Sequence, residues 1–181
     1  MYFFLTILIL FLQFLLVLAM LFIASNMLFA IFVVPWVPTH SKIGREMFRL
    51  AELKPGETVV DFGCGDGSLL LTAVREFGTA QGIGYEIHPG LRLLGRLRAI
   101  KARVSKKIIL RGNNFFKVDL PAADVIVTYL FPETQARLEP LLKKYYPSGT
   151  RVVSRTFLYP TLPLEKTIKI DEETIRLYRI P

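Results

Sequence analysis

The stretch Val59–Leu71, VVDFGCGDGSLLL, decides the fold, because it places three closely spaced glycines between two apolar runs. The first run predicts a buried strand over Thr58–Phe62, and the second predicts a helix over Ser68–Phe77. A strand that passes through glycines into a helix leaves backbone N–H groups free where a ligand can approach. The loop is therefore a candidate binding site.

Strands and helices alternate along the rest of the chain. Further strands are expected over Gly82–Ile87, Ile108–Arg111, Asp124–Tyr129 and Arg151–Phe157, and further helices over Pro89–Val104 and Glu133–Tyr146. The tail predicts a hairpin of Thr167–Ile170 with Thr174–Ile180. This order is typical of an α/β fold with a Rossmann-like sheet that is mostly parallel and ends in an antiparallel hairpin.

The spacing of the loop separates two classes of cofactor. A dinucleotide-binding loop reads G-x-G-x-x-G and holds a pyrophosphate, whereas Gly63, Gly65 and Gly67 follow G-x-G-x-G. Asp61 ends the first strand, where its carboxylate would repel a pyrophosphate but attract the ammonium and sulfonium groups of S-adenosylmethionine. Glu86 ends the second strand, in GIGYEIHPG, and can accept hydrogen bonds from two ribose hydroxyls. The two acids favour S-adenosylmethionine, with a dinucleotide as the alternative.

The first 34 residues differ in composition from the rest of the chain. No charged residue occurs from Met1 to Val34, and a helix needs only about 20 apolar residues to cross a bilayer. A secretory signal would begin with basic residues and end at a small-residue cleavage site, so we expect a retained anchor. The first cations, Lys42, Arg45 and Arg49, follow it, which predicts a single-pass membrane protein with the downstream domain on the cytoplasmic side.

Three parts are expected along the chain. Residues 1–34 form a transmembrane anchor, residues 35–57 a proline-containing connector with a short helix capped by Ser41, and residues 58–181 the cofactor-binding domain. Cys64 is the one cysteine and cannot form an intrachain disulfide, which agrees with a reducing compartment.

The charged side chains all follow the anchor, where 23 Lys and Arg against 15 Asp and Glu give a net charge of +8. The densest basic segment holds Arg92, Arg96, Arg98, Lys101, Arg103, Lys106 and Lys107, without an acidic residue between Leu91 and Val118. Beside a membrane, this Arg92–Lys107 basic face predicts contact with anionic lipid. Nucleic acid is the rival partner, and a solvated helix face is the alternative without a partner.

Four segments together resemble a class I S-adenosylmethionine-dependent methyltransferase over about Thr58–Tyr159: VVDFGCGDG, GYE, RGNNFF and DVIVTYLFP. The stretches VPWVPT, FFKVDLPAADVIVTYLFPE and GTRVVSRTFLYP are similar to the small membrane-anchored protein-lysine methyltransferases, which modify the adenine nucleotide translocase and the c subunit of ATP synthase. The resemblance implies S-adenosyl-L-methionine as cofactor and N-methylation of a lysine of a membrane protein. Two alternatives stay open: methylation of a small or lipid amine, and a non-catalytic, membrane-tethered protein that binds S-adenosylmethionine or a nucleotide.

The resemblance also implies roles for individual residues. A first group would surround the amino-acid part of the cofactor: Asp61, Gly63, Gly65 and Gly67. Glu86 would bind the ribose. Asn114 follows the third strand, where the class often has an aspartate, and would reach the adenine. Asn113 is the alternative for that role, and a turn is the structural alternative for both asparagines.

Methyl transfer would take place at the end of the fourth strand, in VTYLFPE, which Thr128, Tyr129 and Phe131 would line. Tyr129 and Phe131 can hold a lysine side chain by cation–π and apolar contacts, but either ring can equally belong to the core. Enzymes that methylate the amino groups of nucleobases or glutamine carry Asp or Asn, two prolines and an aromatic residue. That signature is absent, which argues against nucleic acid as the acceptor.

The connector and the fifth strand supply the remaining candidates. Trp36 and Pro38 are expected to form the rim through which a membrane-protein substrate presents its side chain, with a rigid linker as the alternative. Arg155 and Thr156 end the fifth strand, but the sequence does not decide their roles. The two histidines lie far apart without a cysteine or acid cluster at ligand spacing, so no metal is expected.

Overall fold

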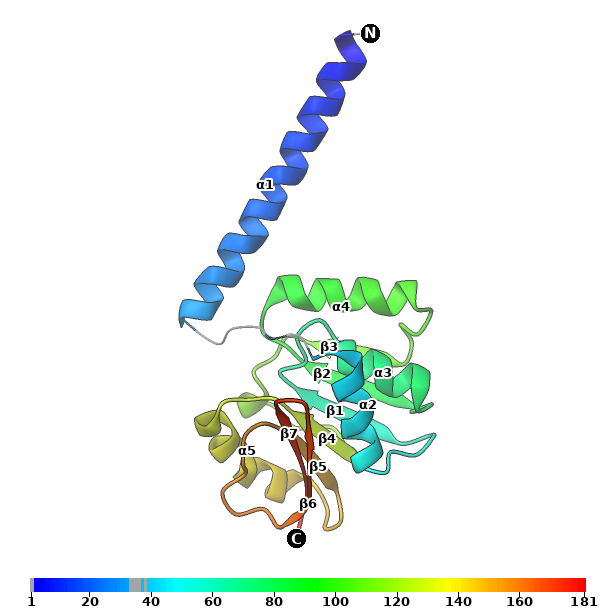
Figure 1. The fold of residues 1–181 in the computed structure, drawn as a ribbon, viewed down its shortest axis with the longest axis vertical. Coiled ribbons are helices and arrows are strands. Elements are labelled where there is room, and N and C mark those ends of the chain that lie inside the picture. The colour runs from blue at the N-terminus through cyan, green and yellow to red at the C-terminus, as the bar shows by residue number, and fades with distance from the viewer. Residues whose placement is uncertain (1, 33–36, 38) are drawn as a thin grey trace. The chain divides into compact units, whose positions relative to one another are not determined.

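The computed structural model describes residues 2–32, 37 and 39–181. The chain divides into two compact units, Met1–Val37 and Pro38–Pro181. The first unit contains the helix α1 (Tyr2–Phe32), whose segment Phe3–Ser25 is long and apolar enough to cross a membrane. The second unit contains the other helices and the strands (Figure 1).

Strands and helices alternate in the second unit, and their bounds agree with the predicted ones to within a few residues. The helices are α2 (Ser41–Leu50), α3 (Ser68–Glu76), α4 (Pro89–Lys101) and α5 (Pro132–Tyr145), with a short 3-10 turn, η1, at Phe115–Lys117. The strands are β1 (Thr58–Phe62), β2 (Gln81–Tyr85), β3 (Ile108–Arg111), β4 (Val125–Thr128), β5 (Arg151–Arg155), β6 (Leu164–Ile170) and β7 (Glu173–Arg179).

The seven strands form one sheet in the order β3-β2-β1-β4-β5-β7-β6. Strands β1 to β5 pair in parallel, and β7 runs antiparallel to both of its neighbours. The predicted fold class, a mostly parallel Rossmann-like sheet with an antiparallel terminal hairpin, is confirmed. The strand order reverses between β1 and β4, and the carboxyl ends of strands at such a reversal are where α/β proteins bind ligands.

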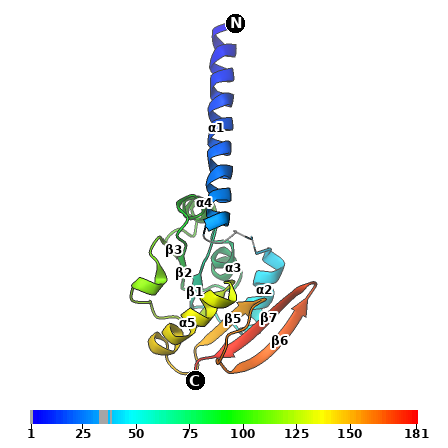
Figure 2. The same cartoon turned by 90° about the vertical axis from the view of Figure 1, so that its left-hand side faces the viewer.

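Alternate residues of the central strands pack on opposite faces of the sheet. Val59 and Val153 belong to a core shared with α2, α3 and α4, whereas Val60 and Val152 belong to a core shared with α5. The helices accordingly lie on both sides of the sheet (Figure 2). Because both faces are covered, the central strands are apolar throughout rather than alternating with polar residues.

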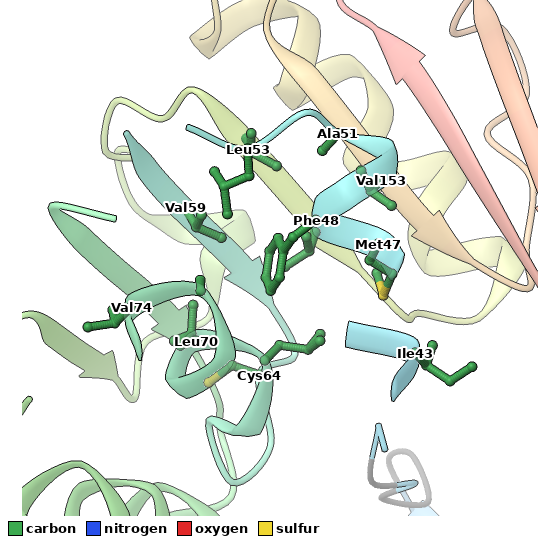
Figure 3. Packing of buried hydrophobic residues seen from close by; sticks show 14 of the residues in the cluster. Ile43, Met47, Phe48, Ala51, Leu53, Val59, Cys64, Leu70, Val74 and Val153 are labelled. Atoms are coloured by element: carbon green, nitrogen blue, oxygen red, sulfur yellow. The ribbon is translucent and has the colours of Figure 1, made fainter. Parts of the chain in front are cut away.

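The helix α2 is part of the core of the second unit. Met47 and Phe48 are fully buried, and Figure 3 shows the ring of Phe48 between α2 and Val59 of β1. The start of the helix differs from the prediction, because His40 rather than Ser41 occupies the N-cap position, without a capping hydrogen bond from its side chain. Burial of the apolar face thus stabilises α2 without a side-chain cap.

We expect Phe48→Ala to lower the free energy of unfolding by about 3–5 kcal/mol, because it removes a large, fully buried side chain and leaves a cavity in the core. Leu164→Ala is the control, because Leu164 is 51% exposed on β6 and its truncation should change stability by less than about 0.5 kcal/mol. Urea unfolding of the detergent-solubilised chain, followed by circular dichroism, measures both. Equal losses in the two variants would contradict the packing of α2 described above.

Candidate cofactor and substrate site

The loop between β1 and α3 is held against the end of β2. The N–H groups of Gly63 and Cys64 both donate to the carbonyl of Tyr85, at 2.9 and 3.0 Å, and the N–H of Gly65 donates to Oε2 of Glu86 at 3.0 Å. The three loop glycines have φ angles of 82° at Gly63, 54° at Gly65 and 71° at Gly67. These left-handed conformations favour glycine. The structure therefore brings the predicted glycines and the predicted ribose-binding acid together.

Glu86 joins this loop to the start of α4. Its Oε1 accepts from the N–H of His88 at 2.7 Å, while Oε2 accepts from Gly65. His88 caps α4 in turn, because its Nδ1 accepts from the N–H groups of Gly90 and Leu91. The carboxylate of Glu86 is half-buried and oriented by two backbone donors, and each of its oxygens has a further lone pair for a ligand hydroxyl.

Asp61 lies one residue before the end of β1 and is buried. Burial, followed by the negative charges of Glu86 and Asp66, raises the pKa of its carboxyl to about 8. Asp66, in contrast, has a cationic partner, because it forms an ion pair with Arg98. It also accepts a hydrogen bond from the N–H of Ser68 at 3.1 Å. A cationic group beside Asp61 would stabilise its ionised form. The site therefore fits a ligand with an ammonium group.

Asn113 and Asn114 follow β3, the neighbour of β2, and both are exposed. The Oδ1 of Asn114 accepts from the N–H of Phe116 at 3.0 Å and caps the turn η1. The ring of Phe115, in the same turn, packs edge-on against Phe62 with ring centroids 5.1 Å apart. The structure thus gives Asn114 a place in a turn, and its second lone pair and amide N–H groups remain for a ligand.

The residues predicted to line the acceptor end follow β4. Thr128 is fully buried, and the hydroxyl of Tyr159 donates to its Oγ1 at 3.2 Å, so Thr128 is held within the core. Tyr129 is half-buried and stacks on Phe157, with centroids 6.2 Å apart and an interplanar angle of 14°. Phe131 is 40% exposed, and its ring centroid lies 6.2 Å from that of Phe157. Phe157 is therefore a member of this aromatic group that the sequence did not identify.

Arg155, whose role the sequence left open, contacts the acceptor end directly. Its guanidinium carbon lies 4.2 Å from the ring centroid of Tyr129. The side chain is buried, donates to Oγ1 of Thr39 at 3.1 Å and forms an ion pair with Glu173. Thr156 has a left-handed φ of 67° and donates to the same carboxylate at 2.9 Å. Tyr129 thus makes a cation–π contact with Arg155 of the same chain, and its predicted contact with a substrate lysine stays a prediction.

Two groups of predicted residues remain. Trp36 and Pro38, the expected substrate rim, lie outside the described residues. In the Arg92–Lys107 basic face, Arg98 pairs with Asp66, and Nη1 of Arg92 donates to the carbonyl of Glu86 at 2.9 Å. Part of the basic segment therefore supports the glycine loop and the end of β2.

The buried Asp61 carboxyl predicts a pH-dependent stability. Its pKa is higher in the folded state than in the unfolded chain, so its contribution to stability is present at low pH and decreases as pH rises toward 8. Asp61→Asn removes this titration. We expect the stability of Asp61→Asn relative to the native chain to increase by up to about 1.4 kcal/mol per pH unit between pH 6 and 8.

Urea unfolding at several pH values, with S-adenosylmethionine absent, measures this difference. Asp66→Asn is the matched control, because Asp66 is paired with Arg98 and its replacement should destabilise the fold at every pH in that range. A difference between Asp61→Asn and the native chain that does not change with pH would contradict the assignment.

Comparison with known proteins agrees with this geometry. Residues 61–166 match the family model described as the ANTKMT methyltransferase domain. A protein-lysine N-methyltransferase of Saccharolobus islandicus is 34% identical over 157 residues, which cover 81% of this chain and 94% of the relative. The adenine nucleotide translocase lysine N-methyltransferase of Mus musculus is 34% identical over 71% of this chain, but the match spans only 55% of the mouse protein.

A solved structure is similar over nearly the same region. An RNA methyltransferase of Salinibacter ruber, in complex with S-adenosyl-L-homocysteine, has a TM-score of 0.77 and 31% identity, and the match covers 80% of this chain and 94% of that one. S-adenosylmethionine is accordingly the cofactor of this fold, in agreement with the prediction from Asp61 and Glu86. From its family-model match and its archaeal relative, the chain belongs to the S-adenosylmethionine-dependent protein-lysine N-methyltransferases of the ANTKMT domain family.

Proposed function

We propose that the chain is held in a membrane by α1 and methylates a lysine side chain of a membrane protein. The observation that carries this proposal is the apolar segment Phe3–Ser25, long enough to span a bilayer, in a protein-lysine methyltransferase. Lys42, Arg45 and Arg49 follow the span, which supports a cytoplasmic location of the catalytic domain. The mouse relative is named for a translocase lysine, which supports the substrate class.

The cofactor supplies a methyl group bound to a positively charged sulfur. Asp61 would pair with its ammonium group, which would offset the cost of burying the ionised carboxylate. The backbone of the Gly63–Gly67 loop would surround the amino-acid part, because the glycines leave no side chains in the way. Glu86 would accept hydrogen bonds from the ribose hydroxyls, and Asn113 or Asn114 would contact the adenine.

At the acceptor end, the chain must bind a lysine and favour its neutral form. A lysine of pKa about 10.4 requires about 4–5 kcal/mol to lose its proton at pH 7. The rings of Tyr129 and Phe131 would surround the side chain with apolar surface, which lowers its pKa, and the nearby guanidinium of Arg155 acts in the same direction. Thr128 would form the buried floor of this region. Orientation of the amine in line with the sulfur would supply most of the rate.

Two other acceptors have support. The Salinibacter ruber structure is named as an RNA methyltransferase, and the Arg92–Lys107 basic face suits a phosphate backbone, so RNA is the second candidate. A small or lipid amine is a third, because α1 and contact of the basic face with anionic lipid would bring the site close to headgroups. The absence of the nucleobase-type signature after β4 favours the lysine over RNA.

A methyl-transfer assay separates the three acceptors. Purified chain is incubated with S-adenosylmethionine labelled in its methyl group, together with membrane fractions, total RNA or extracted lipid. We expect label in a protein band that releases methylated lysine on hydrolysis, and loss of that label in the Asp61→Asn variant. Label in RNA or in extracted lipid, with unlabelled protein, would overturn the proposal.

Cofactor affinity tests the roles of the two acids. We expect Asp61→Asn and Glu86→Gln each to weaken S-adenosylhomocysteine binding by about tenfold or more, because each removes a charge-assisted hydrogen bond worth about 1.5–3 kcal/mol. Glu172→Gln, in the exposed turn before β7, is the control and should leave the affinity unchanged. Isothermal titration calorimetry measures all three variants. Native affinity in both acid variants would refute the proposed cofactor contacts.

A further inference from the structure

The helix α4 has two apolar stripes, of which only one is buried. Leu91, Gly95 and Ala99 pack on the body of the domain. The second stripe, formed by Leu93, Leu97 and Ile100, is exposed by 57%, 54% and 61%. Their spacing of four and three residues places the three side chains on one side of the helix, which we call the outer stripe.

The orientation of α4 follows from close packing at Gly95. A Cβ added there would lie 2.6 Å from Cδ1 of Leu110 and 3.0 Å from the carbonyl oxygen of Asp66. The position of α4 nearest the glycine loop must therefore be a glycine. Leu93 and Leu97 lie on the other side of the helix and are exposed. A surface helix usually has polar residues on that side, so the outer stripe indicates a contact with another apolar phase.

Cations lie beside this stripe. Arg98 is paired with Asp66, and Arg92 is bonded to carbonyls at the end of β2. The exposed cations of α4 and the turn after it are Arg96, Lys101, Arg103, Lys106 and Lys107. The sequence from residue 92 to residue 118 contains no acidic residue. An apolar stripe with cations beside it is the pattern of a helix that lies in the headgroup region of an anionic bilayer.

We propose that α4 docks the catalytic domain on an anionic lipid surface, with Leu93, Leu97 and Ile100 inserted among the acyl chains and the exposed cations at the headgroup phosphates. Nucleic acid fits this surface less well, because it would use the cations but leave the aliphatic stripe uncovered. The inference rests on the proposed membrane location of the chain, but it concerns a contact separate from α1.

The docked helix would position the site as well as the domain. The start of α4 is joined to the cofactor loop, because Glu86 bonds both Gly65 and His88 just before the helix begins. The carboxyl end of β2 would therefore lie near the headgroups. A lysine at the membrane surface of an embedded protein would be within reach of such a site. The docking of α4 would not bring a lysine of a soluble protein closer to it.

Spin labelling of the full chain tests the proposal. Leu97→Cys and the control Leu164→Cys, an equally exposed leucine on β6, are labelled and reconstituted into vesicles. The native Cys64 is buried, so the native chain serves as the unlabelled blank. Vesicles of neutral phosphatidylcholine are compared with vesicles that contain phosphatidylglycerol. Accessibility to oxygen, which enters the bilayer, is divided by accessibility to a water-soluble nickel chelate.

In the anionic vesicles we expect this ratio to be several-fold higher at position 97 than at position 164. The ratio should fall when Arg96, Lys101 and Arg103 are changed to glutamine, and it should not fall when three exposed cations elsewhere, Lys54, Lys117 and Lys169, are changed in the same way. Equal ratios at positions 97 and 164, in chains that float with the vesicles, would overturn the docking of α4. The same result would not contradict α1 as an anchor.

Three other outcomes would also contradict the docking of α4 on lipid. A chain that does not float with vesicles at all would refute both α1 as an anchor and α4 as a docking helix. Protection of position 97 in detergent that increases with protein concentration would assign the outer stripe to a second copy of the chain. Immobilisation of the label by added RNA, without protection in vesicles, would assign it to nucleic acid. Either of these last two results overturns the lipid proposal.

Discussion

The hydrogen bonds between the Gly63–Gly67 loop and the end of β2 are the contacts on which the rest of the site depends. The Tyr85 carbonyl accepts from two successive amides of the loop, and Glu86 accepts from a third. This approach requires Gly84, because a Cβ there would lie 2.4 Å from Sγ of Cys64. The loop and Glu86 are therefore one hydrogen-bonded unit without a bound cofactor.

Charge is distributed unevenly over this unit. Asp66 is neutralised by Arg98 of α4, while burial and the two neighbouring acids oppose ionisation of Asp61. The ion pair thus stabilises the loop at Asp66. At Asp61, in contrast, ionisation of the buried carboxyl is unfavourable, and a cationic ligand would make it more favourable. The same helix that supplies Arg98 carries the outer stripe of Leu93, Leu97 and Ile100 on its opposite side. Contact with a lipid surface and order in the cofactor loop would then depend on one helix.

The acceptor end is organised by β5 and β7 rather than by β4 alone. Arg155 lies over Tyr129 and is held by Glu173 at the start of β7 and by Thr39 just before α2. The terminal hairpin therefore does more than close the edge of the sheet, because it fixes the cation that faces the proposed lysine-binding ring. The left-handed φ of Thr156 is maintained by the same carboxylate, and such strain is typical of functional sites.

The sequence by itself determined the strands and helices and the places of Asp61 and Glu86 at two strand ends, because apolar runs and glycine spacing act within a few neighbouring residues. It did not determine which stripe of α4 is buried, since helical periodicity fits Leu91, Gly95 and Ala99 as well as the outer stripe. Nor could it assign Arg98 to Asp66 or Arg155 to Tyr129, partners 32 and 26 positions apart. Only the tertiary structure decided these, because the partner of a charge depends on which surfaces meet when the helices pack on the sheet.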